Sequence, residues 1–463
     1  MLRLLAIALL ACVASAGALA TAPSAHAKRV PCVAGQKGKP KCIVLKAKVK
    51  WAADGDTLKP KIKRRGGWSP KTPVRMTGIQ AMELYNYRHR RRKGECMAVE
   101  AAKQLDKLVH GKAFRLVSMH MKPGNGERAR IRSSLQVKRQ GRWIDPAMVL
   151  LEKGLVLWDP DGHEWAWNGA YSRLAEQAAA RGVGLWNPVA CGKPGPAQDA
   201  PLSMKLKWDG EGRDTANSEW VRIKNGDPLN AVSLAGWRLR DAASRAKGGK
   251  DQSAYKFPAG AVIPPGGRIT VRIGRGPNGN GVFHWGLAKA LFQNATNDKK
   301  QIGDGVYLFD PHLEMRAHMQ YPCRTECPEP LAGKVSLEAR YTGATYEWTT
   351  VMNTSSETIW LNEYEMESVP WFYEFGPADV LAPGQALVLF NNRPPDLAPL
   401  TKASAGLVPA VPGRMPFKDV SFFRSWGHTK PLFGDRDDTV TLRNPLGAPV
   451  VCHAWGGEKC PTA

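Results

Sequence analysis

The sequence predicts a mainly β protein in which an OB-type barrel carrying helices is followed by two β-sandwiches. Three observations lead to this fold class. Short strands and helices follow one another between Val44 and Arg181, the C-terminal half repeats its own pattern once, and 46 Gly and 35 Pro provide for many turns between short strands. Hydrophobic residues make up 43% of the chain and charged residues 23%, which excludes wholesale disorder.

The first 27 residues have the pattern of a secretory signal peptide. Arg3 gives a basic start, an apolar stretch runs from Leu4 to Val13, and Ala25-His26-Ala27 is an A-x-A cleavage site. An N-terminal membrane anchor is the alternative, and the small residues and Pro23 after the apolar stretch disfavour it. No later segment reaches about 18 uninterrupted apolar residues. We therefore predict a secreted or envelope-associated protein with no transmembrane span.

Export would place the cysteines in an oxidising compartment, where an even number favours disulfides. Removal of the signal peptide leaves eight, and their clustering suggests the pairs Cys32–Cys42, Cys96–Cys191, Cys323–Cys327 and Cys452–Cys460. Because eight cysteines allow about 105 pairings, the connectivity stays open. Zinc is the alternative, but no CxxC pair meets a second pair or an HxxxH at ligand spacing.

Positive charge is concentrated in one part of the chain. The formal net charge is +25, and residues 28–195 alone carry 35 Lys and Arg against 13 Asp and Glu, whereas residues 196–463 carry 30 against 28. Such an excess over one domain indicates a polyanion partner, either nucleic acid or an anionic envelope polymer. The candidate contact residues are Lys63, Arg64, Arg65, Arg88, Arg90, Arg91, Arg92, Lys93, Arg128 and Arg130.

The basic domain, residues 28–195, has its own order of elements. Hydrophobic patterning predicts strands at Val44–Val49, from Leu58 onward, and at Thr72–Ile79, Ala113–Ser118 and Ser133–Lys138, and helices between Gly94 and Gly111 and at Pro146–Lys153 and Tyr171–Arg181. A turn is expected at Ala53–Thr57, where Asp54-Gly55 is a hairpin signal. Hairpin strands, a helix, two strands and then helices suggest a small barrel of the OB type with helices packed on it.

An ordered set of motifs in this domain resembles the staphylococcal-nuclease-like (thermonuclease) family. The set consists of D-G-D-T at 54–57, V-R-x-x-G-I-x-A-x-E at 74–83, a G-E-C-x-A helix start at 94–98, an Arg-bearing strand, and A-A-A-R-G-x-G-L-W at 178–186. The resemblance covers about residues 44–188. It implies hydrolysis of phosphodiester bonds with a calcium ion, a carboxylate near the attacking water and two arginines on the phosphate.

Carried over residue by residue, the resemblance implies a specific site. Asp56 matches a metal-ligand aspartate, with Asp54 as a second carboxylate beside it, and Arg75 matches the first phosphate-binding arginine. Glu83 matches a general base or water-orienting glutamate, and Arg132 is the best match to the second arginine, ahead of Arg128 and Arg130. Hard cations take oxygen ligands, and guanidinium groups stabilise charge on a transferred phosphoryl group.

One motif departs from the family pattern. Where the family has D-T/A-P-E, this chain has Gln80-Ala81-Met82-Glu83. Gln80 replaces a metal-binding carboxylate with a neutral amide, whose carbonyl oxygen can still serve as a ligand. The loss of charge should weaken calcium binding or change the metal, and Met82 removes a stiffening proline. A non-catalytic barrel that binds nucleic acid or another polyanion is therefore the alternative to a nuclease.

The chain beyond the linker at 192–201 repeats itself. Glu219-Trp220-Val221-x-Ile223-x-Asn225 recurs as Glu347-Trp348-x-x-Val351-x-Asn353, and Asp304-Gly305-Val306-Tyr307-Leu308 recurs as Asp438-Thr439-Val440-Thr441-Leu442. Short alternating strands between Pro-Gly turns indicate a β-sandwich in each copy, at 196–328 and 329–463.

The first copy resembles the lamin-tail domain, an immunoglobulin-like sandwich, over about 201–327. The resemblance rests on E-W-V-x-I-x-N, L-x-G-W-x-L-R-D, F-P-A-G-x-x-I-P-P-G and G-D-x-x-x-L-x-D, and it is weaker in the second copy. It implies binding or anchoring modules, whose partner would be an envelope polymer or a surface protein. Trp220, Trp237 and Trp348 are expected in the cores, and His163, His284, His318 and His428 are isolated in the sequence and expected to have packing or surface roles.

Overall fold

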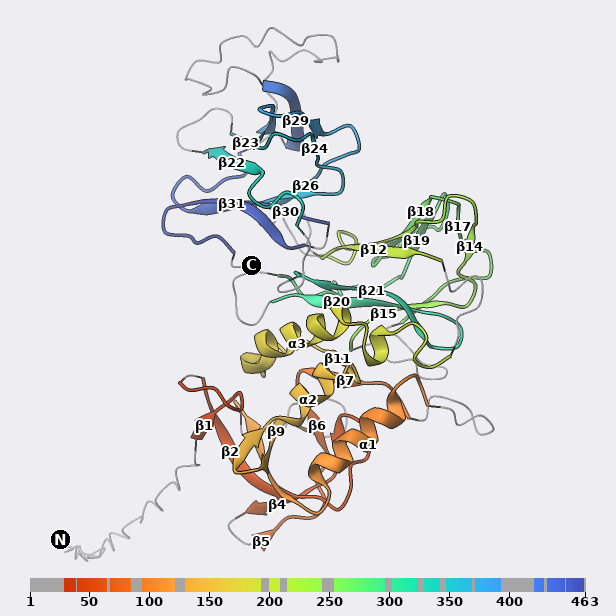
Figure 1. The fold of residues 1–463 in the computed structure, drawn as a ribbon, viewed down its shortest axis with the longest axis vertical. Helices are drawn as coiled ribbons and strands as arrows, with labels where there is room; N and C mark the ends of the chain where they lie inside the picture. The colour runs from red at the N-terminus through yellow and green to blue at the C-terminus, as the bar shows by residue number, and fades with distance from the viewer. Residues whose placement is uncertain are drawn as a thin grey trace, which may run out of the picture.

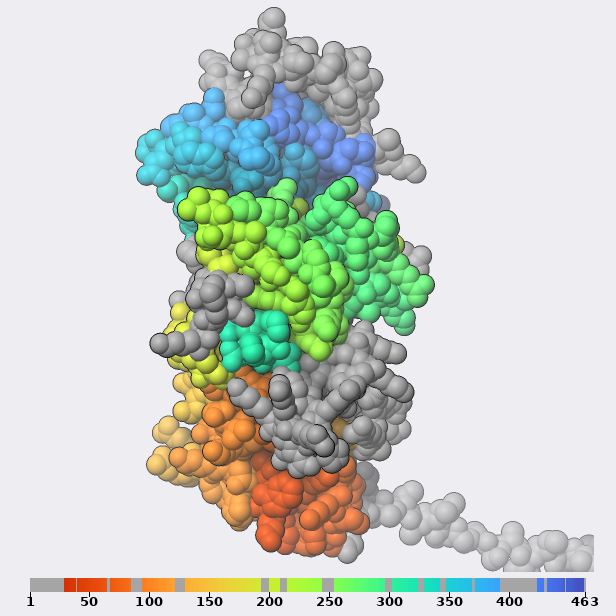
Figure 2. Space-filling model, turned by 90° about the vertical axis from the view of Figure 1, so that its right-hand side faces the viewer, coloured from red at the N-terminus to blue at the C-terminus, as the bar shows by residue number. Residues whose placement is uncertain are grey.

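The computed structural model of the chain describes residues 29–38, 40–64, 67–84, 94–120, 130–192, 200–208, 215–243, 254–295, 302–323, 329–341, 347–368, 371–392, 420–428, 431–445 and 447–461. Strands dominate, as predicted, and three units stack along the long axis: N-terminal (29–192), middle (200–323) and C-terminal (329–461) (Figures 1 and 2). Within these residues, no helix has the length and apolar character needed to cross a membrane. The predicted signal peptide lies outside the described residues.

The N-terminal unit is built on a nine-stranded sheet. Its strands follow the order β3-β6-β9-β8-β2-β4-β5, with β1 paired to β2 and β10 paired to β9. The strands are β1 (Arg29–Pro31), β2 (Lys41–Lys48), β3 (Thr57–Leu58), β4 (Lys61–Arg64), β5 (Gly67–Trp68), β6 (Val74–Met76), β8 (Ala113–Ser118), β9 (Ile131–Arg139) and β10 (Arg142–Ile144). The path is open among the described strands, so closure into a barrel stays a prediction.

Three helices cover this sheet, as the apolar spacing predicts: α1 (Ala98–Val109), α2 (Pro146–Glu152) and α3 (Asn168–Ala180). Two 3-10 turns, η1 (Trp165–Trp167) and η2 (Gly184–Trp186), flank α3. The first helix begins later than Gly94 because Met97 has a left-handed φ of 61°. The Asp145 side chain caps α2 by accepting from Ala147 N, with Pro146 in the first turn.

The segment expected as one strand at Thr72–Ile79 is two strands. β6 ends at Met76, and β7 (Ile79–Ala81) pairs separately with β11 (Val156–Trp158). Gly78 makes the break with a φ of +74°, and a Cβ at this position would lie 2.6 Å from the Tyr171 ring. The turn lets Arg75 on β6 and Gln80 on β7 meet.

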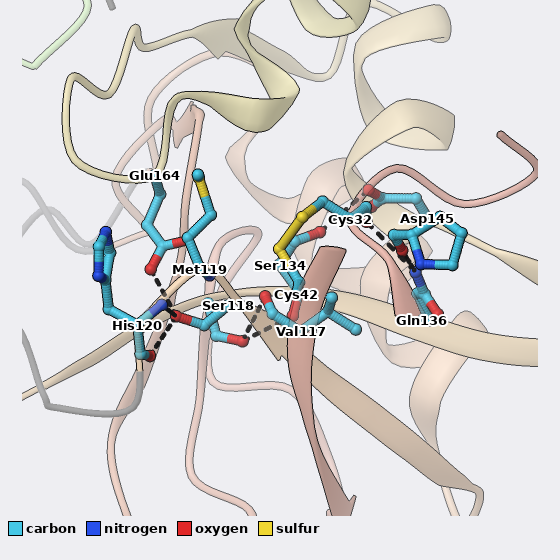
Figure 3. Close-up of a disulfide and its surroundings, with 12 residues drawn as sticks. Cys32, Cys42, Val117, Ser118, Met119, His120, Ser134, Gln136, Asp145 and Glu164 are labelled. Atoms are coloured by element: carbon cyan, nitrogen blue, oxygen red, sulfur yellow. Dashed lines mark hydrogen bonds between the residues drawn. A yellow bond between two sulfur atoms is a disulfide. The ribbon is translucent and has the colours of Figure 1, made fainter. Parts of the chain in front are cut away.

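Three predicted disulfides are confirmed within the described residues: Cys32–Cys42, Cys96–Cys191 and Cys452–Cys460. Cys323 is also disulfide-bonded, and its predicted partner Cys327 lies outside the described residues. The first bridge sits against β9, where Gln136 Nε2 donates to the Cys32 carbonyl (3.3 Å; Figure 3). Disulfides of this number are typical of an oxidising compartment.

The middle and C-terminal units have the same strand order, as the sequence repeat predicts. Sheets β12-β13-β18-β19, β14-β17 and β16-β15-β20-β21 recur as β22-β23-β28-β29, β24-β27 and β26-β25-β30-β31. The middle strands are β12 (Leu202–Lys207), β13 (Trp220–Asn225), β14 (Val232–Ser233), β15 (Arg238–Asp241), β16 (Tyr255–Lys256), β17 (Val262–Ile263), β18 (Arg268–Arg272), β19 (Val282–His284), β20 (Asp304–Phe309) and β21 (Met315–Tyr321). The C-terminal strands are β22 (Val335–Arg340), β23 (Trp348–Asn353), β24 (Ile359–Trp360), β25 (Glu365–Ser368), β26 (Trp371–Glu374), β27 (Val380–Leu381), β28 (Ala386–Asn392), β29 (Val420–His428), β30 (Asp438–Arg443) and β31 (Pro449–Trp455).

The repeated glutamates hold the same loop in both units. Glu219 accepts hydrogen bonds from the main-chain N–H groups of Leu291 (2.6 Å) and Phe292 (3.0 Å), and Glu347 accepts from Leu432 (2.7 Å) and Phe433 (3.0 Å). Of the repeat tryptophans, Trp237 and Trp348 are buried as predicted. Trp220 is only half-buried, and the Arg222 guanidinium lies 4.4 Å from its ring centre.

Candidate functional site

The turn at Asp54–Thr57 is fixed by the first of its two carboxylates. Asp54 Oδ1 accepts hydrogen bonds from the main-chain N–H groups of Asp56 (3.0 Å) and Thr57 (2.6 Å). Gly55 is required between them, because a Cβ would lie 2.6 Å from the Cβ of Ala101 on α1 and 2.7 Å from that of Ala81 on β7. The turn therefore packs tightly between the helix and the strand.

Asp56 is the buried centre of the site, with 2% of its surface exposed. Its Oδ2 accepts from the main-chain N–H of Ala81 (2.7 Å), and its Oδ1 accepts from the Thr57 hydroxyl (2.9 Å) and forms an ion pair with Arg75 Nη1. The aspartate thus joins the turn, β7 and β6.

Arg75 and Arg132 are register partners on the parallel strands β6 and β9. Register partners in neighbouring strands point to the same face of the sheet, so both guanidinium groups leave one face. The Arg75 side chain is 13% exposed and the Arg132 side chain is 50% exposed. The two arginines predicted to bind phosphate therefore lie together, one buried and one open to solvent.

Gln80 is bonded to Arg75. Its Oε1 accepts a hydrogen bond from Arg75 Nη2, and its Nε2 donates to the Ala81 carbonyl (2.7 Å). The side chain is buried. The carbonyl oxygen that was predicted to reach a metal ion is therefore engaged by the guanidinium.

Asp161, which the motifs did not single out, holds the second arginine. Its Oδ2 accepts from Arg132 Nη1 (2.9 Å) and from the Thr77 hydroxyl (2.9 Å), while its Oδ1 accepts from the main-chain N–H groups of His163 and Glu164 (both 2.9 Å). The sequence signal was the Asp-Pro-Asp-Gly turn directly after a short apolar strand. His163, expected to have a packing or surface role, stacks its ring on that of His120 with the ring centres 3.8 Å apart.

The carboxylates around Arg75 have raised pKa values. Burial, with the charge of Asp56, raises the pKa of Asp54 to about 7. Burial also raises the pKa of Asp159 to about 6, and the nearby Arg75 charge limits the rise. Burial lowers the pKa of Arg75, but the charges of Asp56, Asp159 and Asp54 outweigh this effect and raise it. The Arg75 guanidinium therefore stays charged, and three carboxylates stabilise its positive charge.

Glu83 lies two residues beyond Ala81, and its main chain forms two hydrogen bonds with Glu95. The Glu83 main-chain N–H donates to Glu95 Oε2 (2.8 Å), and the Glu95 N–H donates to the Glu83 carbonyl (2.9 Å). The Glu83 side chain is half-buried. These contacts fix its backbone, and its role toward a water molecule stays a prediction.

The described part of the chain contains no group of three or more His, Cys, Asp or Glu side chains placed to hold a metal ion. Asp54 and Asp56 lie side by side in the turn, where Asp54 Oδ1 accepts from the Asp56 main-chain N–H (3.0 Å). Two adjacent carboxylates fit a hard divalent cation that completes its shell with water and a substrate phosphate. The fit rests on this pair alone, since the Gln80 oxygen is bound by Arg75, and within the pair Asp56 forms an ion pair with the same guanidinium.

Further basic residues lie on the same sheet, some of them several strands away from Arg75 and Arg132. Lys63 and Arg64 are exposed on β4, and Arg130 is half-buried just before β9. The ammonium groups of Lys48 and Lys63 lie 4.4 and 5.8 Å from the ring centre of Trp68, which is 40% exposed. The other predicted contact residues, Arg65, Arg88, Arg90, Arg91, Arg92, Lys93 and Arg128, lie outside the described residues.

The middle unit, next to this site, has two four-stranded sheets and a two-stranded sheet around one apolar core. Residues 206–322 match the family model of the Lamin Tail Domain. The match confirms the predicted immunoglobulin-like fold of this unit, which we call the lamin-tail module. No curated protein matches the chain. The resemblance of residues 44–188 to the nuclease-like family stays a prediction.

The lamin-tail module packs directly on the candidate site. One apolar cluster joins Met82, Leu157 and Trp186 of the N-terminal unit to Tyr307 and Phe309 of the module. Figure 1 shows β15 and β20 of the module beside α3, β7 and β11. Met82, which stands where the pattern of the nuclease-like family has proline, is buried in this contact.

Proposed function

We propose that this protein is a secreted, metal-dependent nuclease, in which an OB-type N-terminal unit hydrolyses phosphodiester bonds. The observation that carries the proposal is the pairing of Arg75 with Arg132 on one face of the sheet, beside Asp54 and Asp56. Two guanidinium groups next to a carboxylate pair are suited to a phosphate and a cation. The excess positive charge of residues 28–195 supports a nucleic-acid substrate.

The difference in solvent exposure between the two arginines suggests a different role for each in catalysis. Arg132, half exposed and oriented by Asp161, binds the phosphate first, and Arg75, held by Asp56 and Gln80, stabilises the charge that develops on it. Glu83 orients the attacking water or accepts its proton. Asp54 and Asp56 would hold the divalent cation, calcium in the first instance, which supplies positive charge next to the phosphate.

A non-catalytic role is the second candidate, and Gln80 is the observation that favours it. The amide is neutral, and its oxygen is bound to Arg75. In this reading the basic unit binds nucleic acid or an anionic envelope polymer without cutting it, and Trp68 with its two lysines is part of the contact surface.

We propose binding or anchoring roles for the other two units. The C-terminal unit is a diverged second lamin-tail-like sandwich, supported by the shared strand order and the paired roles of Glu219 and Glu347. An envelope polymer or a surface protein is the proposed partner of these modules.

A cleavage assay separates the two readings. The mature chain is incubated with plasmid DNA and with RNA in calcium, magnesium, manganese or EDTA, and Glu83→Gln serves as the control. We expect metal-dependent cleavage by the wild type and none by the variant. Tight, salt-sensitive binding without cleavage under any metal would establish the non-catalytic reading.

A further inference from the structure

Arg240 extends from β15 of the lamin-tail module into the N-terminal unit. Its side chain is 3% exposed, its Nη1 lies 3.8 Å from Glu95 Oε1, and its Nη2 lies 3.5 Å from Met82 Sδ. Its guanidinium carbon lies 4.7 Å from the ring centre of Phe309. These contacts on several sides leave the guanidinium little freedom to move.

Glu95 connects this arginine to Glu83. The Glu95 side chain is 1% exposed, with one oxygen toward Arg240 and the other accepting the Glu83 main-chain N–H (2.8 Å). The next residue, Cys96, is bonded to Cys191, shortly before the segment that leads into the lamin-tail module. The backbone of Glu83 is therefore held by a carboxylate that also contacts a cation of another unit.

A neighbouring residue of the same strand reaches the other side of the site. Asp241 follows Arg240 on β15 and is buried. Its negative charge contributes to the raised pKa of Asp159, and the charge of Asp159 contributes to the raised pKa of Arg75. The end of β15 thus influences both the Glu83 side and the Arg75 side of the cluster.

We propose that the lamin-tail module is a working part of the nuclease-like site, and that Arg240 is a positioning residue that fixes Glu83 through Glu95. This inference rests on the proposed function. Loss of Arg240 leaves a buried carboxylate without this cationic partner, which is strongly unfavourable. Glu95 then reorients toward solvent and releases the Glu83 backbone. A misplaced base or water-orienting group lowers the rate of the chemical step more than it lowers binding.

The test compares Arg240→Ala, Arg240→Lys and Arg222→Ala in the full mature chain. Arg222 is the matched control, because it forms an ion pair across the other junction, with Glu374 (2.6 Å), and is also largely buried. We measure kcat and KM on DNA, and hydrogen exchange of the Glu83 amide with the α2 amides as internal reference. In Arg240→Ala we expect kcat to fall by about ten- to a hundredfold with KM within about twofold, and faster exchange at Glu83 alone. Arg240→Lys should recover part of both effects, and Arg222→Ala should change neither.

The two readouts keep this inference separate from the proposed function. Wild-type kcat and wild-type exchange at Glu83 in Arg240→Ala would overturn the inference. Absence of cleavage by the wild type would overturn the nuclease proposal and with it the catalytic role of Arg240. Exchange at Glu83 would then decide the structural link alone, with faster exchange supporting it and unchanged exchange refuting it. If Arg240→Ala does not fold, wild-type kcat and wild-type exchange in Arg240→Lys do not support the inference, because Lys keeps the positive charge. Glu95→Gln, which weakens the same link from its other end, must then show the fall in kcat or the faster exchange.

Discussion

Arg75 and Arg132 lie at the same register position on two parallel strands, and each is held by its own aspartate. Neighbouring strands are about 5 Å apart, so two like charges at this position would repel each other. Asp56 offsets one charge and Asp161 offsets the other. The difference in exposure assigns a fixed, buried role to Arg75 and a substrate-accessible role to Arg132.

Replacement of Asp161 tests how Arg132 is oriented. In Asp161→Asn the amide oxygen can still accept from His163 N and Glu164 N, but Arg132 loses its carboxylate partner. We expect kcat to fall by about tenfold, which corresponds to about 1.4 kcal/mol. DNA affinity should not weaken, because a negative charge has been removed from a phosphate-binding face. Steady-state kinetics and a binding titration measure the two effects, and weaker DNA binding would count against this role.

Replacement of Gln80 tests the metal site. Gln80→Asp restores a carboxylate next to Asp54 and Asp56, and Gln80→Asn is the neutral control of the same size. We expect Gln80→Asp to bind calcium about tenfold more tightly, because an added carboxylate ligand raises the affinity for a hard cation. Isothermal titration calorimetry measures the affinity. Equal calcium binding by both variants would place the cation elsewhere.

The buried Asp145 should give the stability a defined pH dependence. Burial raises its pKa to about 6, despite hydrogen bonds from Tyr171 (2.6 Å) and Ser134 (3.0 Å). Because the folded state holds the proton more tightly than the unfolded state, its stabilising contribution is present below about pH 4 and is lost as the pH rises through about 6. In Asp145→Asn, which keeps a side-chain cap for α2, the free energy of unfolding should fall less between pH 4 and pH 7. Urea unfolding at both pH values checks this, and an unchanged difference would contradict it.

The repeated glutamates should make similar contributions in the two sandwiches. Glu219→Ala and Glu347→Ala each leave two main-chain N–H groups without a carboxylate acceptor. We expect each to lower the free energy of unfolding by about 2–5 kcal/mol, since a buried unsatisfied donor costs about 1–3 kcal/mol. The Gln variants keep one acceptor oxygen and should cost less. Losses below about 0.5 kcal/mol in both Ala variants would show that the loops are held in another way.

Local sequence patterns predicted most helices and strands of the N-terminal unit. Of the four predicted disulfide pairs, three lie within the described residues, and the structure contains all three. The helix at Ala98–Val109 follows from apolar spacing, and the lamin-tail fold follows from the motifs around Trp220 and Trp237. The start of the helix and the break at Gly78 were missed, because Met97 and Gly78 adopt left-handed backbone conformations that patterning does not reveal.

The candidate site was only partly accessible from the sequence. Asp56, Arg75 and Gln80 were found by motif, and the structure brings them together. Asp161 and Arg240 were missed because each acts across a long sequence separation, on Arg132 and on Glu95. Such contacts depend on how strands and units pack and leave no periodic signal. The burial of Met82 under the lamin-tail module also shows why a proline position in the motif can hold an apolar side chain here.

The most direct test of the proposed nuclease is the initial rate of DNA cleavage by the mature chain and by Arg132→Ala at saturating calcium. Arg132 is half exposed, so its removal disturbs the fold less than removal of the buried Arg75. We predict metal-dependent cleavage by the wild type and a loss of roughly a hundred- to a thousandfold in the variant, which should still unfold cooperatively because Thr77 and two main-chain N–H groups continue to bond Asp161. Cleavage by Arg132→Ala at the wild-type rate, or no cleavage by the wild type with any divalent cation, would contradict the proposal.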